Sequence, residues 1–245
     1  MSVASVKKKL RSFLTKTRDE CVVQHTWVRQ TPVVLTDSKG RYTIAAANDI
    51  NSEPIISWWA RSGRTSAQGV QLVSRSLNLL NDTHKTTQLY VWLGTCDLTI
   101  KQGRYIHLKT TDENSVDEIL RNFEQIVELV RNVNCKVTFL HCPIYSIAIY
   151  NKYRGHPDVA EFHGYDVILK NQIARLNDNI NYLNSVNNTS ISPAFTRLVY
   201  ATKRVRNRSS SRYCYELYVD GIHPDILLAR VWNMLILRRV IRDCY

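Results

Sequence analysis

Apolar residues in this chain follow two alternating patterns: short β-branched runs and longer stretches with helical spacing. Short apolar runs bounded by polar turn residues are typical of buried strands. They predict strands over residues 32–35, 54–60, 88–93, 136–141 and 196–201.

Apolar positions three and four residues apart lie between these runs and indicate helices with one buried face. They predict helices over residues 41–48, 65–80, 115–132 and 165–183, and a last helix after His223. Ser115 and Glu118 have the spacing of a capping box, and Pro224 suits the first turn of the last helix. The basic, serine-rich segment 203–212 is predicted to be a loop.

Alternating strands and helices predict a three-layer α/β/α sandwich around a central parallel sheet of about five strands. No repeat or linker divides residues 31–245, so we expect one domain there. Residues 1–30 are polar and basic, and we expect a flexible N-terminal appendage.

The charge and composition of the chain indicate which classes of partner it can bind. Hydrophobic residues make up 44% of the 245 residues, which is typical of a globular protein, and the net charge is +12. This charge favours anions, including nucleic acid or another polyanion bound through the basic segments. The sequence holds no recognisable RNA- or DNA-binding motif. No apolar run approaches the ~20 residues of a membrane helix, so we expect no membrane span.

The N-terminus lacks the apolar core of a secretory signal, which predicts an intracellular, cytoplasmic protein. We therefore expect the six cysteines to be free thiols. Neither these cysteines nor the histidines have the spacing of a metal site, and we expect no metal and no cofactor.

Four polar segments carry the candidate chemistry. Asp37-Ser38, Ser62-Gly63 and Gly94-Thr95-Cys96-Asp97 each follow a predicted strand, and open α/β sheets bind ligands at those ends. The fourth segment, Asp220-Gly221-Ile222-His223, precedes the last helix. This segment contains an acid, Asp220, and a base, His223, three residues apart. A serine hydrolase needs such a pair to activate its nucleophile, and Ser38 is the candidate nucleophile.

In this order and spacing the four segments resemble the SGNH (GDSL-type) hydrolase superfamily, over almost all of residues 31–245. The resemblance implies that Ser38 is the nucleophile, His223 the general base and Asp220 the acid that orients it. It places the oxyanion hole at Ser38, Gly63 and Cys96. Esterase-like domains of this kind also occur in proteins of some retrotransposons.

Two positions depart from the superfamily pattern. Thr36 stands where the family has glycine, and Cys96 stands where it has the oxyanion-hole asparagine. A thiol is a weak donor, and loss of one such donor lowers the rate by about 10²–10³. Two functions follow: a slow serine-dependent acyl or acetyl esterase acting on small esters, or a non-catalytic module that binds nucleic acid or a protein through its basic surface.

Overall fold

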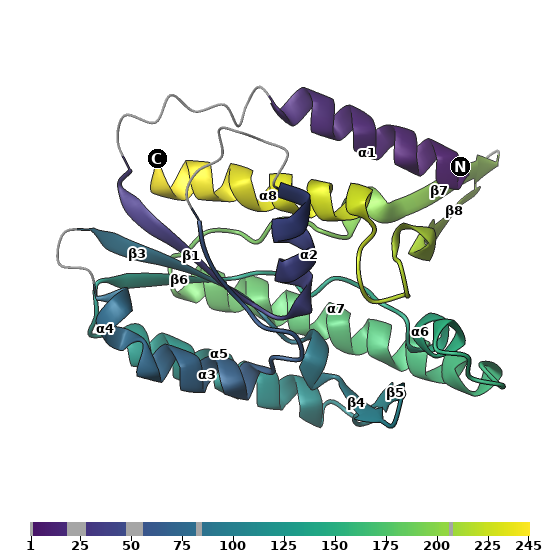
Figure 1. Ribbon diagram of the computed structural model, residues 1–245, viewed down its shortest axis with the longest axis horizontal. Helices are drawn as coiled ribbons and strands as arrows, with labels where there is room; N and C mark the ends of the chain where they lie inside the picture. The colour runs from purple at the N-terminus through teal and green to yellow at the C-terminus, as the bar shows by residue number, and fades with distance from the viewer. Residues whose placement is uncertain (1, 19–27, 48–55, 82–84, 206–207) are drawn as a thin grey trace.

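The computed structural model describes residues 2–18, 28–47, 56–81, 85–205 and 208–245 (Figure 1). Within them, four parallel strands form the central sheet in the order β2-β1-β3-β6. These strands are β1 (Gln30–Thr36), β2 (Ser57–Ala60), β3 (Thr86–Trp92) and β6 (Cys135–Phe139). Each overlaps a predicted strand, and residues 54–55 of the second predicted strand lie outside the described part.

Helices cover both faces of the sheet (Figure 1). On one face lie α2 (Ser38–Ala47) and α8 (Ile226–Cys244), and on the other α3 (Ser66–Arg75), α5 (Asn114–Val130) and α7 (His163–Val186). The short α4 (Leu77–Leu80) follows α3. β3 is buried along almost its whole length because helices cover both of its sides. The predicted three-layer α/β/α sandwich is confirmed.

The chain reverses direction across the sheet between β1 and β3. It passes from β1 to β2 on one side and then returns to β3 on the other side of β1. At such a switch point the connections leave in opposite directions and open a crevice beyond the strand ends. The segments that follow β1 and β3 both enter this crevice.

The predicted fifth strand of the sheet is wrong. Residues 197–199 form a 3-10 turn, and β7 (Tyr200–Val205) pairs antiparallel with β8 (Arg208–Tyr213) away from the central sheet. Within the segment predicted as a loop, residues 203–205 and 208–212 therefore belong to a two-stranded ribbon. Local antiparallel pairing satisfies the backbone groups of a short β-branched run without a place in a larger sheet.

Two predicted helix starts also differ. α5 has Glu113 at its N-cap, and Ser115 hydrogen-bonds the Thr110 hydroxyl at 2.9 Å, so the capping box is not formed. α8 begins after Asp225, whose carboxylate accepts from the Leu228 N–H at 2.8 Å. Asp225 caps the helix and leaves Pro224 outside the first turn.

The described part of the N-terminal segment is ordered as α1 (Val3–Arg18), which lies along α8 (Figure 1). Val6 and Leu10, four residues apart on one helix face, are fully buried in the main hydrophobic core. This part is a packed helix and not the flexible appendage that its polar composition predicted. The domain boundary at residue 31 stays a prediction.

Three small elements were not predicted: β4 (Thr99–Gln102), β5 (Tyr105–Leu108) and α6 (Ile147–Tyr153). They follow the carboxyl ends of β3 and β6 and project beyond the sheet (Figure 1). No helix among the described residues is long and apolar enough to cross a membrane.

Candidate active site

Ser38 stands at the point where β1 passes into α2. The strand ends at Thr36, Asp37 forms the connection, and Ser38 is the first residue of the helix. This turn is tight: a Cβ on Gly40 would lie 2.1 Å from Cγ2 of Thr36. A residue without a side chain at position 40 therefore allows α2 to start against the strand. Asp37 accepts the first N–H groups after Ser38, that of Lys39 at its Oδ1 at 2.9 Å and that of Gly40 at its carbonyl oxygen at 3.2 Å.

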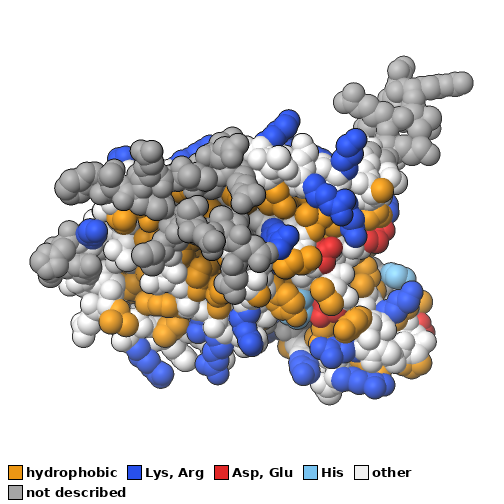
Figure 2. Space-filling model, turned by 45° about the horizontal axis from the view of Figure 1, so that its top comes forward, with side chains coloured by type: hydrophobic (Ala, Val, Ile, Leu, Met, Phe, Trp, Pro, Cys, Tyr) orange, Lys and Arg blue, Asp and Glu red, His pale blue; other side chains and the backbone are white. Residues whose placement is uncertain are grey.

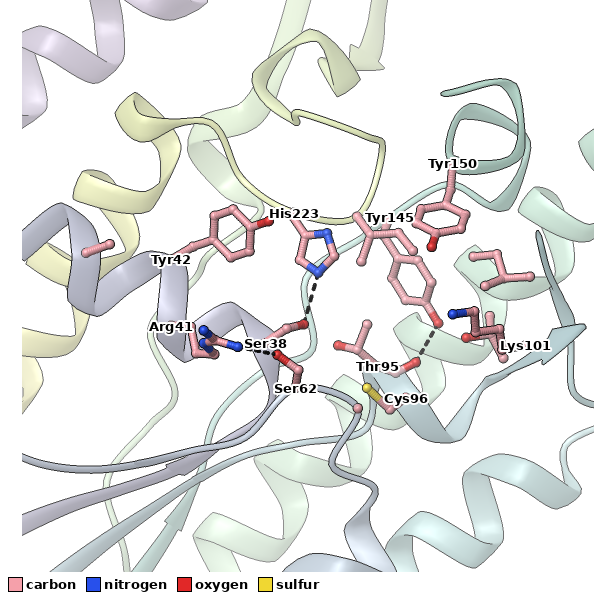
Figure 3. A pocket seen from close by; sticks show the side chains of 15 residues that line it. Ser38, Arg41, Tyr42, Ser62, Thr95, Cys96, Lys101, Tyr145, Tyr150 and His223 are labelled. Atoms are coloured by element: carbon pink, nitrogen blue, oxygen red, sulfur yellow. Dashed lines mark hydrogen bonds between the residues drawn. The ribbon is translucent and has the colours of Figure 1, made fainter. Parts of the chain in front are cut away.

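Ser38, His223 and Asp220 lie in one hydrogen-bonded line (Figure 3). The Ser38 Oγ to His223 Nε2 distance is 3.1 Å, and His223 Nδ1 lies 2.7 Å from Asp220 Oδ2. Because the carboxylate accepts the Nδ1–H, Nε2 is free to accept the serine proton. The structure thus brings together three residues that the sequence spreads over 185 positions.

The turn that carries Asp220 and His223 is fixed from both sides. Asp220 Oδ1 accepts the backbone N–H groups of Ile222 at 3.0 Å and His223 at 2.8 Å. Gly221 has a φ of +88°, and a Cβ there would lie 2.8 Å from the side chain of Ile149. Burial raises the pKa of Asp220, but the hydrogen bonds from His223 and the backbone outweigh burial and hold the pKa below its ordinary value.

An aromatic ring supports the imidazole. Tyr42 stacks on His223 with ring centroids 4.8 Å apart and planes 21° from parallel (Figure 3). Tyr42 lies one turn beyond Ser38 on α2, so one helix carries both the serine and the ring that packs on the histidine.

A cavity of about 750 Å³ opens in front of Ser38 and His223. Gly63 and Cys96, the other two predicted oxyanion-hole positions, line the same cavity. The remaining walls come from α2, from β4 and β5, and from the segment containing α6, and include Tyr145 and Tyr150 (Figure 3). All five predicted site residues therefore lie at this one place.

The Cys96 thiol is not directed into the cavity as an oxyanion-hole donor would be. Its S–H points to Asp37 Oδ2, with Sγ at 3.8 Å from that oxygen. Burial raises the pKa of Cys96, so the thiol stays protonated. A weak donor whose proton is directed at a carboxylate is a poor substitute for an amide N–H.

A buried ion pair lies beneath this site. Lys39 is 1% exposed and Asp37 is fully buried, and the ammonium donates to the Asp37 carboxylate. It also donates to Thr95 Oγ1 at 2.6 Å. Burial is the largest single influence and would lower the pKa of Lys39, but the charge and hydrogen bond of Asp37, together with Cys142 and Cys96, outweigh it and the pKa is raised. The pair links the end of β1 to the loop after β3.

Asp97 joins the two loops proposed to form the oxyanion hole. Its carboxylate accepts the backbone N–H of Ser66 at 2.9 Å and the Ser66 hydroxyl at 2.7 Å. Ser66 begins α3, directly after the loop that contains Gly63. Asp97 therefore holds the loop after β3 against the loop after β2.

The sequence did not predict Lys39, Arg41 and Tyr42 as site residues. A signal was present for two of them, because Arg41 and Tyr42 lie three and four residues after Ser38 and so share its helix face. Lys39 carried no such signal, because lysine is almost never fully buried. In the part of the chain that the structure describes, no group of three His, Cys, Asp or Glu side chains is placed to hold a metal ion.

Solved structures similar to this chain include a lipase and a lipase/acylhydrolase. A GDSL-like lipase from Bacteroides thetaiotaomicron VPI-5482 aligns with a TM-score of 0.56 at 16% identity, over 95% of this chain and 97% of its own. A lipase/acylhydrolase from Enterococcus faecalis aligns with a TM-score of 0.53 at 12% identity, over 88% of this chain and 97% of its own.

No protein-family model and no curated protein sequence matches the chain. At these identities the structural likeness establishes the architecture: the chain has the fold of the SGNH hydrolases, as the four sequence segments predicted.

Proposed function

We propose that the protein is a serine-dependent carboxylic ester hydrolase of the SGNH type. The observation that carries the proposal is the hydrogen-bonded line from Ser38 through His223 to Asp220, at 3.1 and 2.7 Å. The line opens on a cavity large enough for a small ester. The fold shared with lipases and acylhydrolases supports the same assignment.

In the proposed mechanism Ser38 attacks the ester carbonyl while His223 Nε2 accepts the serine proton. Asp220 stabilises the imidazolium that forms, and its lowered pKa keeps it ionised for this task. His223 then donates the proton to the departing alcohol and leaves an acyl group on Ser38. A water molecule, deprotonated by His223, attacks the acyl-enzyme, which releases the carboxylic acid and restores Ser38.

The negative charge of each tetrahedral intermediate needs donors. The backbone N–H groups of Ser38 and Gly63 are the proposed pair, with Cys96 at the third position. Since the Cys96 thiol is a weak donor directed at Asp37, we expect slow turnover. Cys96→Asn is the direct test of that expectation, with kcat as the measurement.

Hydrolysis of p-nitrophenyl acetate by the wild type and by Ser38→Ala tests the proposal. We expect Ser38→Ala and His223→Ala to lose at least about 10³-fold in kcat. Ser74→Ala, an exposed serine on α3, is the matched control and keeps wild-type rates. Equal rates for wild type and Ser38→Ala would contradict a serine hydrolase.

The alternative of a basic module that binds nucleic acid gains no support from the comparisons, which find hydrolases. The side chains of residues 203–209, the core of the basic segment, lie outside the described part. A polyanion partner stays an untested prediction.

A further inference from the structure

The cavity in front of Ser38 carries positive charge without matching negative charge. Arg41 and Lys101 line it, and no acidic side chain is among the described residues of its wall. Two carboxylates of the site are already occupied, since Asp220 pairs with His223 and Asp37 with Lys39. The cationic groups of the wall are therefore not neutralised by these carboxylates.

Arg41 has N–H donors that make no hydrogen bond to the described residues. Its guanidinium carries five N–H groups, and one nitrogen donates to the Ser62 hydroxyl at 3.2 Å. Among the described residues Arg41 has no acidic partner, in contrast to Arg175, which binds Glu113 and Asp117 at 2.7 and 2.8 Å. Its one hydrogen bond holds Arg41 beside Gly63, with the remaining donors open to a ligand.

Lys101 supplies the second charge from another element. It lies on β4, is exposed, and has no ion-pair partner among the described residues. In Figure 3 Arg41 and Lys101 stand on opposite sides of Ser38 and His223, with Tyr145 between Lys101 and the serine. An acidic group on either side of a scissile ester bond at Ser38 would thus meet a cation.

The charge of the surface beyond the cavity also favours anionic ligands. Blue Lys and Arg side chains are frequent on the face drawn in Figure 2, and red Asp and Glu side chains are scarce. A positive protein surface raises the local concentration of anions and speeds their association. It would not attract neutral esters.

We infer that the substrate is an acidic ester, one that carries a carboxylate or phosphate group beside the ester bond; this rests on the proposed esterase function. Arg41 binds the anionic oxygens through its planar fork, which matches both groups. Lys101 receives an anion on the opposite side. The tyrosines of the wall contact the uncharged part of the ester.

Binding to Ser38→Ala protein tests the inference without turnover. On the alcohol side the ligands are 4-acetoxybenzoate, 4-acetoxyphenyl phosphate and the neutral 4-acetoxybenzamide. On the acyl side they are monophenyl adipate and phenyl hexanoate. We expect the anionic member of at least one set to bind about tenfold more tightly than its neutral match, measured by calorimetry. The carboxylate and phosphate arms show which anion fits better.

Variants assign the preference to the proposed cations. In the Ser38→Ala background, Arg41→Gln or Lys101→Gln should reduce the anionic preference at least about threefold, and high salt should weaken it. Arg131→Gln is the control: it removes the same charge from a side chain that pairs with Glu128 outside the cavity. Equal affinities for charged and neutral ligands in both sets would overturn the inference.

Turnover separates this outcome from the esterase proposal. Ser38-dependent hydrolysis of esters without any anionic preference would overturn the inference and leave the esterase standing. An anionic preference that depends on Arg41 or Lys101, without turnover in the wild type, would support the binding site and contradict the esterase.

Discussion

At the scale of single residues, the least expected feature is a lysine buried directly after the proposed nucleophile. A charged side chain is stable in the interior only when it is paired and hydrogen-bonded. Lys39 meets this requirement through Asp37 and Thr95. The pair holds together the two loops that flank Ser38, so its stability and the geometry of the site are linked.

Replacing one residue of the pair should lower the free energy of unfolding more than replacing both. We expect Asp37→Asn or Lys39→Met to lower the free energy of unfolding by about 3–5 kcal/mol, because each leaves a buried charge alone. The double variant should recover much of that loss. Urea unfolding measures all three, and a double variant as unstable as the sum of the single ones would contradict the coupling.

The pH dependence of the pair has a definite sign. Because folding raises the pKa of Lys39, the stabilisation is complete below the unfolded value of about 10.4 and is lost as the pH rises through the folded value. The double variant should lack this alkaline loss.

At the scale of elements, the site depends on how β1 turns into α2. Gly40 allows the helix to begin after a single connecting residue, Asp37, and the Ser38 hydroxyl at this turn lies 3.1 Å from His223 Nε2. Thr36, where the family has glycine, supplies the methyl group that comes closest to position 40. With Thr36 at this position, a Cβ on residue 40 would overlap the threonine methyl group.

Gly40→Ala should displace the start of α2. We expect kcat to fall and the free energy of unfolding to drop by about 1–3 kcal/mol, because the new Cβ overlaps Thr36. Adding Thr36→Ser, which removes that methyl group, should restore part of both. Gly164→Ala in α7 is the control, since a Cβ there meets nothing within 4 Å. Unchanged kcat in Gly40→Ala would show that the turn does not position Ser38.

The sequence predicted the alternation of strands and helices well because buried parallel strands and amphipathic helices have distinct periods. It misplaced residues 196–201, since a short apolar run predicts a strand by composition, whereas residues 197–199 form a 3-10 turn and only residues 200–201 belong to the ribbon. It predicted Ser38, Asp220 and His223 as candidate site residues by motif, but not Arg41 or Lys101. These two are common surface residues, and only the fold shows that they line one cavity.

At the scale of the whole molecule, the chain adds a helix outside the three layers. α1 packs on α8, and α8 in turn contacts α2 and β1. The buried Val6 and Leu10 make α1 part of the core although its other face is strongly basic. The positive charge of this helix is thus fixed to the body of the protein.

Leu10→Ala should lower the free energy of unfolding by about 2–5 kcal/mol, because it leaves a cavity between α1 and α8. Lys9→Ala, on the exposed side of α1, should change it by less than about 0.5 kcal/mol. Thermal or urea unfolding gives both values. No effect of Leu10→Ala would mean that α1 is detached in solution.

The turn that carries Asp220 and His223 has a kinetic consequence. Acid and base are three residues apart and bonded to each other, so this half of the site forms locally. Ser38 is 185 residues away and joins them only when α8 and the turn before it dock beside α2. Recovery of ester hydrolysis during refolding would therefore time the final long-range closure of the chain, separately from the earlier growth of helix and sheet.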